Sequence, residues 1–210
     1  MKQIFILGAS SVYGVGGADG GWADMVKRYY HHRMFDEGGM GEKFEVYNFA
    51  KSGATIEFIE QTFPQQFKDY GRGQEAAIFL SIGGNDAKAE GEPDRFVSTP
   101  EDFGEKAKRL LVSLKEAAGQ VVVVSNGYVD EAKTNPKSNP LTGSRSYFTN
   151  ERRQLFNQTT AGVCRELGIP FVGIVPDIAE WQEKYLYRDG LHPNQAGHEL
   201  IYASLKQYLD

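Results

Sequence analysis

The stretch at residues 2–10, KQIFILGAS, begins the chain with a short apolar run that ends in a glycine turn. Apolar residues in this run are nearly continuous rather than alternating, which is typical of a strand buried on both faces of a sheet. Further runs of this kind lie at 44–49 (FEVYNF), 76–82 (AAIFLSI), 121–125 (VVVVS) and 171–175 (FVGIV). Together the runs predict a sheet of five buried strands.

Helical patterns of apolar residues separate these runs. They lie at Trp22 to Phe35, Ile56 to Phe67, Pro100 to Ala118, Asn150 to Leu167 and Asn194 to Leu209. The alternation of strand and helix predicts right-handed crossovers and a parallel sheet covered by helices on both faces. We therefore expect residues 1–210 to form a single α/β domain, a three-layer α/β/α sandwich with a five-stranded parallel sheet.

Charge and composition exclude several classes of partner. The net charge is -5 at pH 7, and no basic run is longer than Arg152-Arg153, so nucleic acid is not an expected partner. No stretch approaches the roughly 18 consecutive apolar residues of a membrane span, and the first apolar run is too short for a secretory signal, which places the protein in the cytoplasm. The single cysteine, Cys164, sits in an apolar helical pattern, and we expect a buried, inert thiol.

Side chains with chemical functions follow the predicted strands. Ser10 comes after the first strand, Gly53 after the second and Asn85 after the third. Near the end of the chain, Asp189 precedes His192 by three residues. Because the carboxyl ends of parallel strands share one edge of a sheet, these residues are expected to meet there. A hydroxyl, an amide, and a carboxylate beside an imidazole are the groups that acyl transfer requires.

The segments that carry these residues also resemble a known family. They are GAS at 8–10, KSGAT at 51–55, GGND at 83–86 and DGLHP at 189–193. In this order, and spread over nearly the whole chain, they resemble the four sequence blocks of the SGNH (GDSL-type) hydrolase superfamily. The resemblance implies the flavodoxin-like three-layer fold of that superfamily and the activity of a serine hydrolase.

Carried over residue by residue, the resemblance implies a role for each residue. Ser10 matches the nucleophile, and Asp189 and His192 match the pair that activates it. The backbone N–H groups of Ser10 and Gly53 and the side-chain amide of Asn85 match the oxyanion hole.

The nucleophile turn departs from the family pattern. The family usually has Gly-Asp-Ser, whereas this chain has Ala9 between Gly8 and Ser10. The missing carboxylate leaves open how the turn is held and how active the protein is. Ser11 is a second hydroxyl beside Ser10, and we favour Ser10 because it keeps the family's spacing from Gly8. A non-catalytic binding module on the same fold is one alternative that Ala9 keeps open.

A cofactor-binding enzyme is a second alternative. GASSVYG at 8–14 resembles the first turn of short-chain dehydrogenases, whose backbone N–H groups hold the pyrophosphate of NAD(P). Tyr202 and Lys206 have the Y-x-x-x-K spacing of that family's catalytic pair. However, Val12 stands where the turn needs a glycine, and the Tyr-Lys pair lies at the end of the chain instead of near its middle.

We therefore expect a serine esterase that cleaves small or short-acyl esters, such as acetyl esters of carbohydrates, through an acyl-enzyme. Its partner would be a small-molecule ester, and the reaction needs no metal or cofactor. A metal site of Asp189, His192 and His198 matches no helical H-x-x-x-H pattern. His198 is expected to be structural, and His31 and His32 to be solvated. The sequence leaves open which ester is cleaved and the oligomeric state.

Three segments are expected to be loops. The glycine-rich segment 14–21 (GVGGADGG) is expected to form a mobile wall of the pocket. The connections at 86–98 and 126–147 are too long to be simple crossings, and loops of this length in a small domain are usually functional or mobile.

Overall fold

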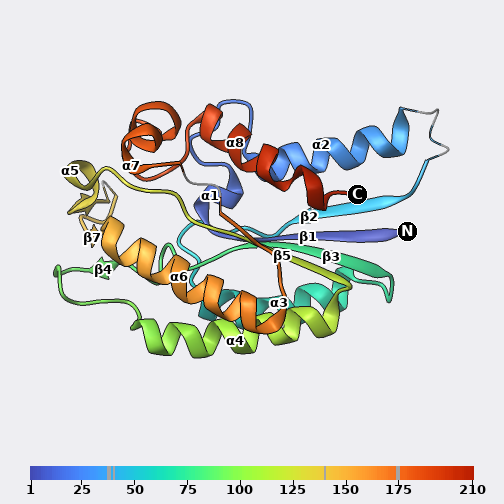
Figure 1. Ribbon diagram of the computed structural model, residues 1–210, viewed down its shortest axis with the longest axis horizontal. Helices are drawn as coiled ribbons and strands as arrows, with labels where there is room; N and C mark the ends of the chain where they lie inside the picture. Colours follow the sequence, from blue (N-terminus) through green and yellow to red (C-terminus); the bar gives the residue numbers. More distant parts are fainter. Residues whose placement is uncertain (37–38, 40, 140, 174–175) are drawn as a thin grey trace.

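A central parallel sheet organises the computed structural model, which describes residues 1–36, 39, 41–139, 141–173 and 176–210 (Figure 1). Its strands are β1 (Lys2–Gly8), β2 (Phe44–Asn48), β3 (Glu75–Ser81), β5 (Gln120–Val124) and β8 (Phe171–Val172). They lie in the order β2-β1-β3-β5-β8, and every pairing between neighbours is parallel. The five-stranded sheet of the sequence analysis is confirmed; residues 174–175 of its last predicted strand lie outside the described residues.

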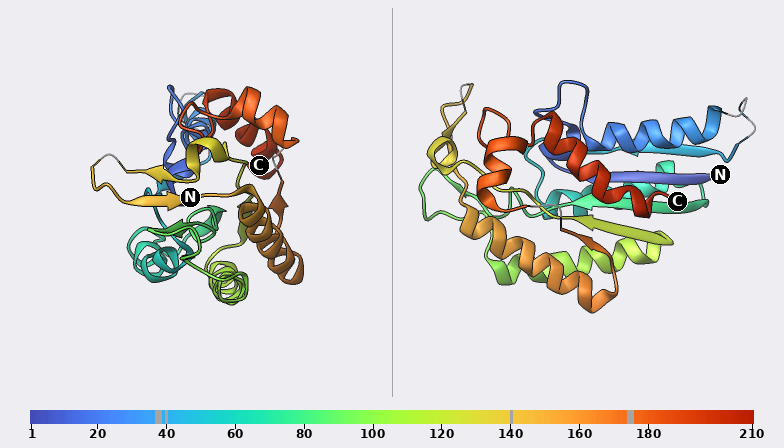
Figure 2. Two further views of the ribbon diagram at one scale, coloured as in Figure 1. Left: turned by 90° about the vertical axis from the view of Figure 1, so that its left-hand side faces the viewer. Right: turned by 45° about the horizontal axis from the view of Figure 1, so that its top comes forward.

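Helices cover both faces of this sheet. On one face lie α2 (Trp22–Phe35) and α8 (Gln195–Leu205), and on the other lie α3 (Ile56–Tyr70), α4 (Pro100–Ala117) and α6 (Asn150–Leu167) (Figures 1 and 2). The predicted helices are all present, with small differences at their ends. Helix α3 continues past Phe67 to Tyr70, and α8 ends at Leu205 and is followed by the 3₁₀ turn η2 (Lys206–Tyr208). The molecule is therefore the expected three-layer α/β/α sandwich.

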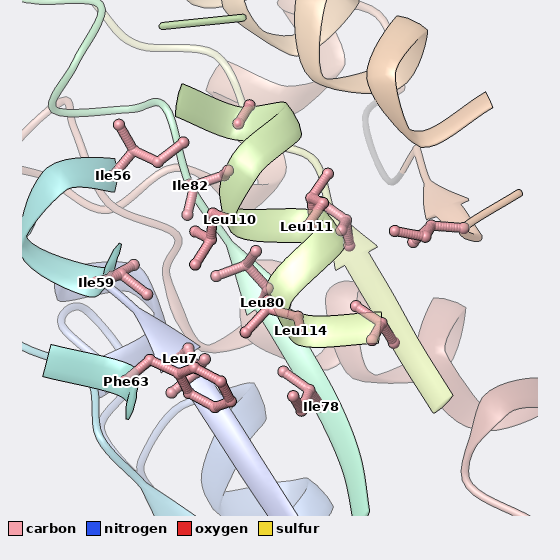
Figure 3. Packing of buried hydrophobic residues seen from close by; sticks show 14 of the residues in the cluster. Leu7, Ile56, Ile59, Phe63, Ile78, Leu80, Ile82, Leu110, Leu111 and Leu114 are labelled. Carbon is pink, nitrogen blue, oxygen red and sulfur yellow. The ribbon is translucent and has the colours of Figure 1, made fainter. Parts of the chain in front are cut away.

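Successive residues of each central strand face opposite layers, because side chains alternate across a strand. On β1, Phe5 and Leu7 pack against α3 and α4, whereas Ile4 and Ile6 pack against α2 and α8. Figure 3 shows the first of these layers, in which Leu110, Leu111 and Leu114 of α4 lie over β3. Both faces of the sheet are thus buried, which explains the continuous apolar runs in the sequence.

The single cysteine belongs to the same core. Cys164 on α6 is fully buried, and burial raises the pKa of its thiol to about 12. The expected burial of this thiol is therefore confirmed.

The two long connections form a second, smaller sheet that the sequence analysis did not predict. Its strands are β4 (Ala89–Glu90), β6 (Lys137–Ser138) and β7 (Arg145–Tyr147), paired antiparallel in the order β4-β7-β6. The short helix α5 (Glu131–Thr134) precedes β6. These elements lie beyond the carboxyl ends of the central strands, at the end of the molecule that also carries α7 (Ile178–Glu180) and η1 (Trp181–Tyr185), while the short helix α1 (Ser10–Tyr13) directly follows β1 (Figure 1). The connections are thus partly ordered by pairing with each other.

No helix among the described residues has the length and apolar character needed to cross a membrane.

Candidate active site

The turn after β1 presents Ser10 at the edge of the sheet. Gly8 has a φ of 154°, and a Cβ at this position would lie 2.3 Å from Cγ2 of Val12 and 2.7 Å from the carbonyl oxygen of Ser81. Only glycine fits this close approach. Ser10 then begins α1, while Val12, which is 1% exposed, packs into the core beneath it. Ala9 precedes the helix and makes no side-chain cap.

The turn that carries Ser10 is thus held without a carboxylate at position 9. Close packing at Gly8, the buried Val12 side chain and the backbone bonds from Val12 N and Tyr13 N to the carbonyl oxygen of Ala9 fix it instead.

A turn before α8 brings His192 to Ser10. The Nε2 atom of His192 lies 2.8 Å from Oγ of Ser10, and its Nδ1 atom lies 2.6 Å from Oδ2 of Asp189. The second carboxylate oxygen of Asp189 accepts the backbone N–H groups of Leu191 and His192, at 3.0 and 3.1 Å. The three predicted residues therefore form one hydrogen-bonded chain, although Ser10 and His192 are 182 positions apart.

The charge of Asp189 fixes the direction of these bonds. Burial alone would raise the pKa of this carboxyl, but the hydrogen bond from His192 and those from the backbone N–H groups outweigh it and hold the pKa well below its usual range. Lys137 adds a cation 3.5 Å from Oδ2. Because an ionised carboxylate only accepts hydrogen bonds, Nδ1 of His192 carries a proton, and in the neutral imidazole Nε2 then accepts the hydroxyl proton of Ser10. This is the arrangement of a serine poised to lose its proton to a base.

Asn85 belongs to the same site and lies in the turn after β3. One N–H of its amide donates to the carbonyl oxygen of Ala54 at 2.9 Å. The described residues provide no acceptor for the second N–H, and Asn85 lines the same cavity as Ser10 and His192. The amide can therefore donate a hydrogen bond to a ligand in that cavity.

Gly53, the other predicted donor, occupies the turn before α3. Its φ of 82° is a left-handed conformation that favours glycine. Ala54 lines the cavity, whereas Gly53 itself is exposed and is not among the lining residues. The structure therefore brings Ser10, Asn85 and His192 together around the cavity, with Asp189 bonded to His192, whereas Gly53 only precedes the lining residue Ala54.

Asp86 holds the Asn85 turn to the Gly53 turn. Its Oδ1 accepts the backbone N–H of Ile56 at 3.0 Å, at the start of α3, while its Oδ2 is buried without a partner among the described residues. Burial raises the pKa of this carboxyl to about 6. No role was predicted for Asp86, which belongs to the GGND segment of the sequence. Asp86 therefore links the turn that carries Asn85 to the start of α3.

The cavity beside Ser10 has a volume of about 30 Å³. Besides the residues above, its wall includes Ser11, Ser81, Gly84, Asn126, Phe148, Arg153 and Leu191. Arg153 was not among the predicted site residues, because in the sequence it stands out only as part of the longest basic run. A signal was present, because Arg153 lies on the same helical stripe as Phe156, Thr160 and Cys164, which are buried on α6.

The glycine-rich segment 14–21 lines neither this cavity nor the adjoining smaller one, so the expectation of a pocket wall is wrong. The bonds of His198 explain the position of segment 14–21. Fully buried on α8, this histidine lies 3.0 Å through Nε2 from the carbonyl oxygen of Val15 and accepts the N–H of Trp22 at Nδ1, at 3.4 Å. It therefore bonds backbone at both ends of the segment, which confirms its structural role. His31 and His32 are exposed, as expected.

The residues of the dehydrogenase alternative do not form a site. Tyr202 lies on α8 and Lys206 begins η2, and neither lines the two cavities. Lys206 instead extends over the ring of Tyr202, 5.5 Å from its centroid. Within the described part of the chain, no cluster of three or more His, Cys, Asp or Glu could hold a metal ion.

Comparison with known proteins places the fold among hydrolases. The model of the GDSL-like Lipase/Acylhydrolase family matches residues 6–200. A lipase/acylhydrolase from Enterococcus faecalis is 20% identical, with a TM-score of 0.70 over 100% of this chain and 95% of that one. An acetylxylan esterase from Geobacillus stearothermophilus is 15% identical, with a TM-score of 0.67 over 99% and 93% of the two chains. A search of the curated proteins found no match.

Proposed function

Because the chain belongs to the GDSL-like lipase/acylhydrolase family, whose model covers residues 6–200, we propose that it hydrolyses small carboxylic esters through an acyl-enzyme on Ser10. One observation carries the proposal. The Oγ of Ser10 lies 2.8 Å from Nε2 of His192, whose Nδ1 lies 2.6 Å from the Asp189 carboxylate. Both Ser10 and His192 line a cavity. The comparisons add support, because structures of the Geobacillus esterase described as catalytic mutants replace a serine, an aspartate and a histidine.

In the proposed reaction, Ser10 attacks the ester carbonyl while its proton passes to Nε2 of His192. Asp189 stabilises the imidazolium that results, because its charge lies against Nδ1. The amide of Asn85 and the backbone N–H groups of Ser10 and Gly53 bind the oxygen that becomes negative. His192 then gives its proton to the leaving alcohol. A water molecule, activated by His192 in the same way, releases the acid and restores Ser10.

The size of the cavity supports a short acyl group. A volume of about 30 Å³ holds a few water-sized groups, since one water needs roughly 10–15 Å³ measured in this way. Acetyl esters, including those of carbohydrates, fit this limit better than long-chain lipids.

A series of p-nitrophenyl esters of increasing acyl length tests the proposal. We expect the highest kcat/KM with the acetate or propionate and a steep fall beyond the butyrate, measured as release of p-nitrophenol. Ser10→Ala should lower kcat by ~10⁴- to 10⁶-fold, while Ser11→Ala, the matched change on the next residue, should retain most of the rate. Equal losses in the two variants, or a maximum at octanoate, would contradict the proposal.

A further inference from the structure

Arg153 is a buried cation in the wall of the proposed active site. It lies on α6 and is 6% exposed. It lines the cavity that contains Ser10 and His192, and also a second cavity of about 10 Å³. The two cavities share Ser11, Ser81 and Asn126 as well, so the guanidinium stands where they adjoin.

The guanidinium of Arg153 is largely unpartnered. Its Nε donates to the carbonyl oxygen of Gly127 at 2.9 Å, and no other hydrogen bond or ion pair to a described residue involves it. The neighbouring Arg152 differs: its Nε and Nη2 donate to the carbonyl oxygens of Ala87 and Ser98, both at 2.7 Å, and its guanidinium stacks on Phe96. Arg152 is thus satisfied within the fold, whereas the two terminal amino groups of Arg153 have no acceptor among the described residues.

Arg153 nevertheless keeps its charge. Burial lowers the pKa of its guanidinium to about 10, which leaves it protonated at neutral pH. A buried charge is costly unless an opposite charge and further hydrogen bonds compensate it. The guanidinium presents parallel N–H groups that match the two oxygens of a carboxylate. The missing partner is therefore expected to be an anion that enters the cavity.

The position of Arg153 relates this anion to the reacting ester. A Cβ built on Gly84 would lie 3.9 Å from Nη1 of Arg153, and Gly84 directly precedes Asn85. The guanidinium therefore lies beside the turn that carries a proposed oxyanion donor. Since the cavity is only about 30 Å³, an anionic group bound there and a carbonyl held at Ser10 are separated by a few bonds.

We propose that Arg153 is a specificity-determining residue that binds a carboxylate of the substrate, carried a few bonds from the scissile ester. This inference rests on the proposed hydrolysis at Ser10 and adds the substrate class to it. The net charge of -5 repels anions only weakly, because salt screens it over ~8 Å, whereas Arg153 acts by direct contact. The carboxylate could belong to the acyl group or to the alcohol, and the experiment separates these sources.

Two pairs of esters that differ only in charge provide the test. Monomethyl succinate and its carboxamide analogue carry the test group on the acyl side, and acetoxyacetate and acetoxyacetamide carry it on the alcohol side. Hydrolysis is followed by NMR detection of the released methanol or acetate. In one pair we expect kcat/KM for the carboxylate to exceed that for the carboxamide by ~10- to 100-fold, the range for a hydrogen bond to a charged group.

Variants of Arg152 and Arg153 show which arginine causes the preference for the carboxylate substrate. Arg153→Met should bring the carboxylate-to-carboxamide ratio close to one, mainly through KM, and Arg153→Lys should restore part of it. Arg152→Met removes the same charge one residue away and should keep the wild-type ratio. A ratio near one in the wild-type protein for both pairs, or a ratio that survives in Arg153→Met, would overturn the inference.

A measurement on the wild-type protein keeps the inference testable if the Arg153 variants do not fold. Propionate should inhibit hydrolysis of p-nitrophenyl acetate at a concentration ~10-fold or more below that of propionamide. Equal inhibition by propionate and propionamide would contradict the role of Arg153. It would leave the proposed hydrolysis standing, because the neutral ester p-nitrophenyl acetate is still cleaved. Failure to cleave any ester would contradict the proposed hydrolysis, and with it this inference.

Discussion

His192 and His198 lie six residues apart near the end of the chain and are both buried, with 9% and 0% of their surface exposed. His192 bonds two side chains, the Ser10 hydroxyl and the Asp189 carboxylate. His198 bonds only backbone, the carbonyl oxygen of Val15 and the N–H of Trp22. The difference teaches that partners, rather than burial, separate an imidazole that can move a proton from one that fixes a segment of the chain.

The same contrast applies to the two carboxylates near the site. Asp189 is bonded to His192 and to two N–H groups, which hold its pKa well below the usual range despite burial. Asp86 bonds the N–H of Ile56 at the start of α3 and has one oxygen without a partner among the described residues, and burial raises its pKa to about 6. Substitution of Asp189 or His192, which bond other side chains of the site, should therefore lower activity. Substitution of Asp86 or His198, which bond the backbone, should instead change stability.

Replacing each histidine by alanine gives the largest expected difference. His192→Ala should lower kcat for p-nitrophenyl acetate by ~10⁴- to 10⁶-fold because the proton of Ser10 loses its acceptor. His198→Ala should instead lower the free energy of unfolding by ~2–4 kcal/mol, through the cavity and the unsatisfied backbone groups that it leaves. Initial rates and urea unfolding of both variants measure the two effects. A His198→Ala protein that is fully folded yet as inactive as His192→Ala would remove the distinction.

Asp189→Asn tests whether the carboxylate orients the imidazole. The asparagine keeps the size of the side chain but loses the charge that fixes the proton on Nδ1, so kcat should fall by ~10⁴-fold. Urea unfolding serves as the control, because the variant should remain folded. A loss smaller than tenfold would contradict the role of the carboxylate in orienting the ring of His192.

Asn85→Ala tests the proposed hydrogen-bond donor to the oxyanion. Loss of one donor to the developing oxyanion should lower kcat by ~10²- to 10³-fold with a small change in KM. Because the amide also donates to the carbonyl oxygen of Ala54, part of the loss can come from movement of that turn. Asn85→Asp, which has the same shape and no N–H, should lose at least as much rate. Full activity in either variant would contradict the assignment.

Asp86→Asn has the smallest expected effect, a pH-dependent change in the free energy of unfolding. The folded pKa of about 6 lies above the ordinary aspartate value of 3.8, so the stabilising contribution of the protonated carboxyl is complete below pH 3.8 and is lost as the pH rises through 6. Asparagine is neutral at every pH. The variant should therefore gain stability over the wild-type protein as the pH increases from 4 to 8, by at most ~3 kcal/mol.

Urea unfolding of the wild-type protein and the Asp86→Asn variant at pH 4, 6 and 8 measures this difference. A difference that does not change with pH would mean that Asp86 has an ordinary pKa in the folded protein.

Much of the fold followed from the sequence because its signals are local. Each strand of the main sheet is a short run rich in apolar residues, and helices begin at recognisable caps, such as Thr99, whose side chain accepts the N–H of Asp102. The candidate site followed for the same reason: Ser10, Gly53 and Asn85 each come soon after such a strand, and strand ends meet at one edge of a parallel sheet.

The features that the sequence did not predict depend on contacts between distant residues. The strands β4, β6 and β7 have only two or three residues each, which is too short for a periodic pattern. The segment 14–21 is rich in glycine and reads as mobile, but His198, far along the chain, bonds its backbone. In the sequence, the position of Arg153 next to Arg152 suggests a charge on the surface. Only the packing of α6 against the sheet places Arg153 in the cavity wall.

Labelling with a fluorophosphonate, followed by mass mapping of the modified peptide, tests the central claim most directly. Such a reagent forms a bond with a serine whose proton a neighbouring base removes. The account predicts one adduct per chain on Ser10, abolished in His192→Ala and retained in His198→Ala. An adduct on Ser11 or elsewhere, or no adduct in a protein that still cleaves p-nitrophenyl acetate, would contradict it.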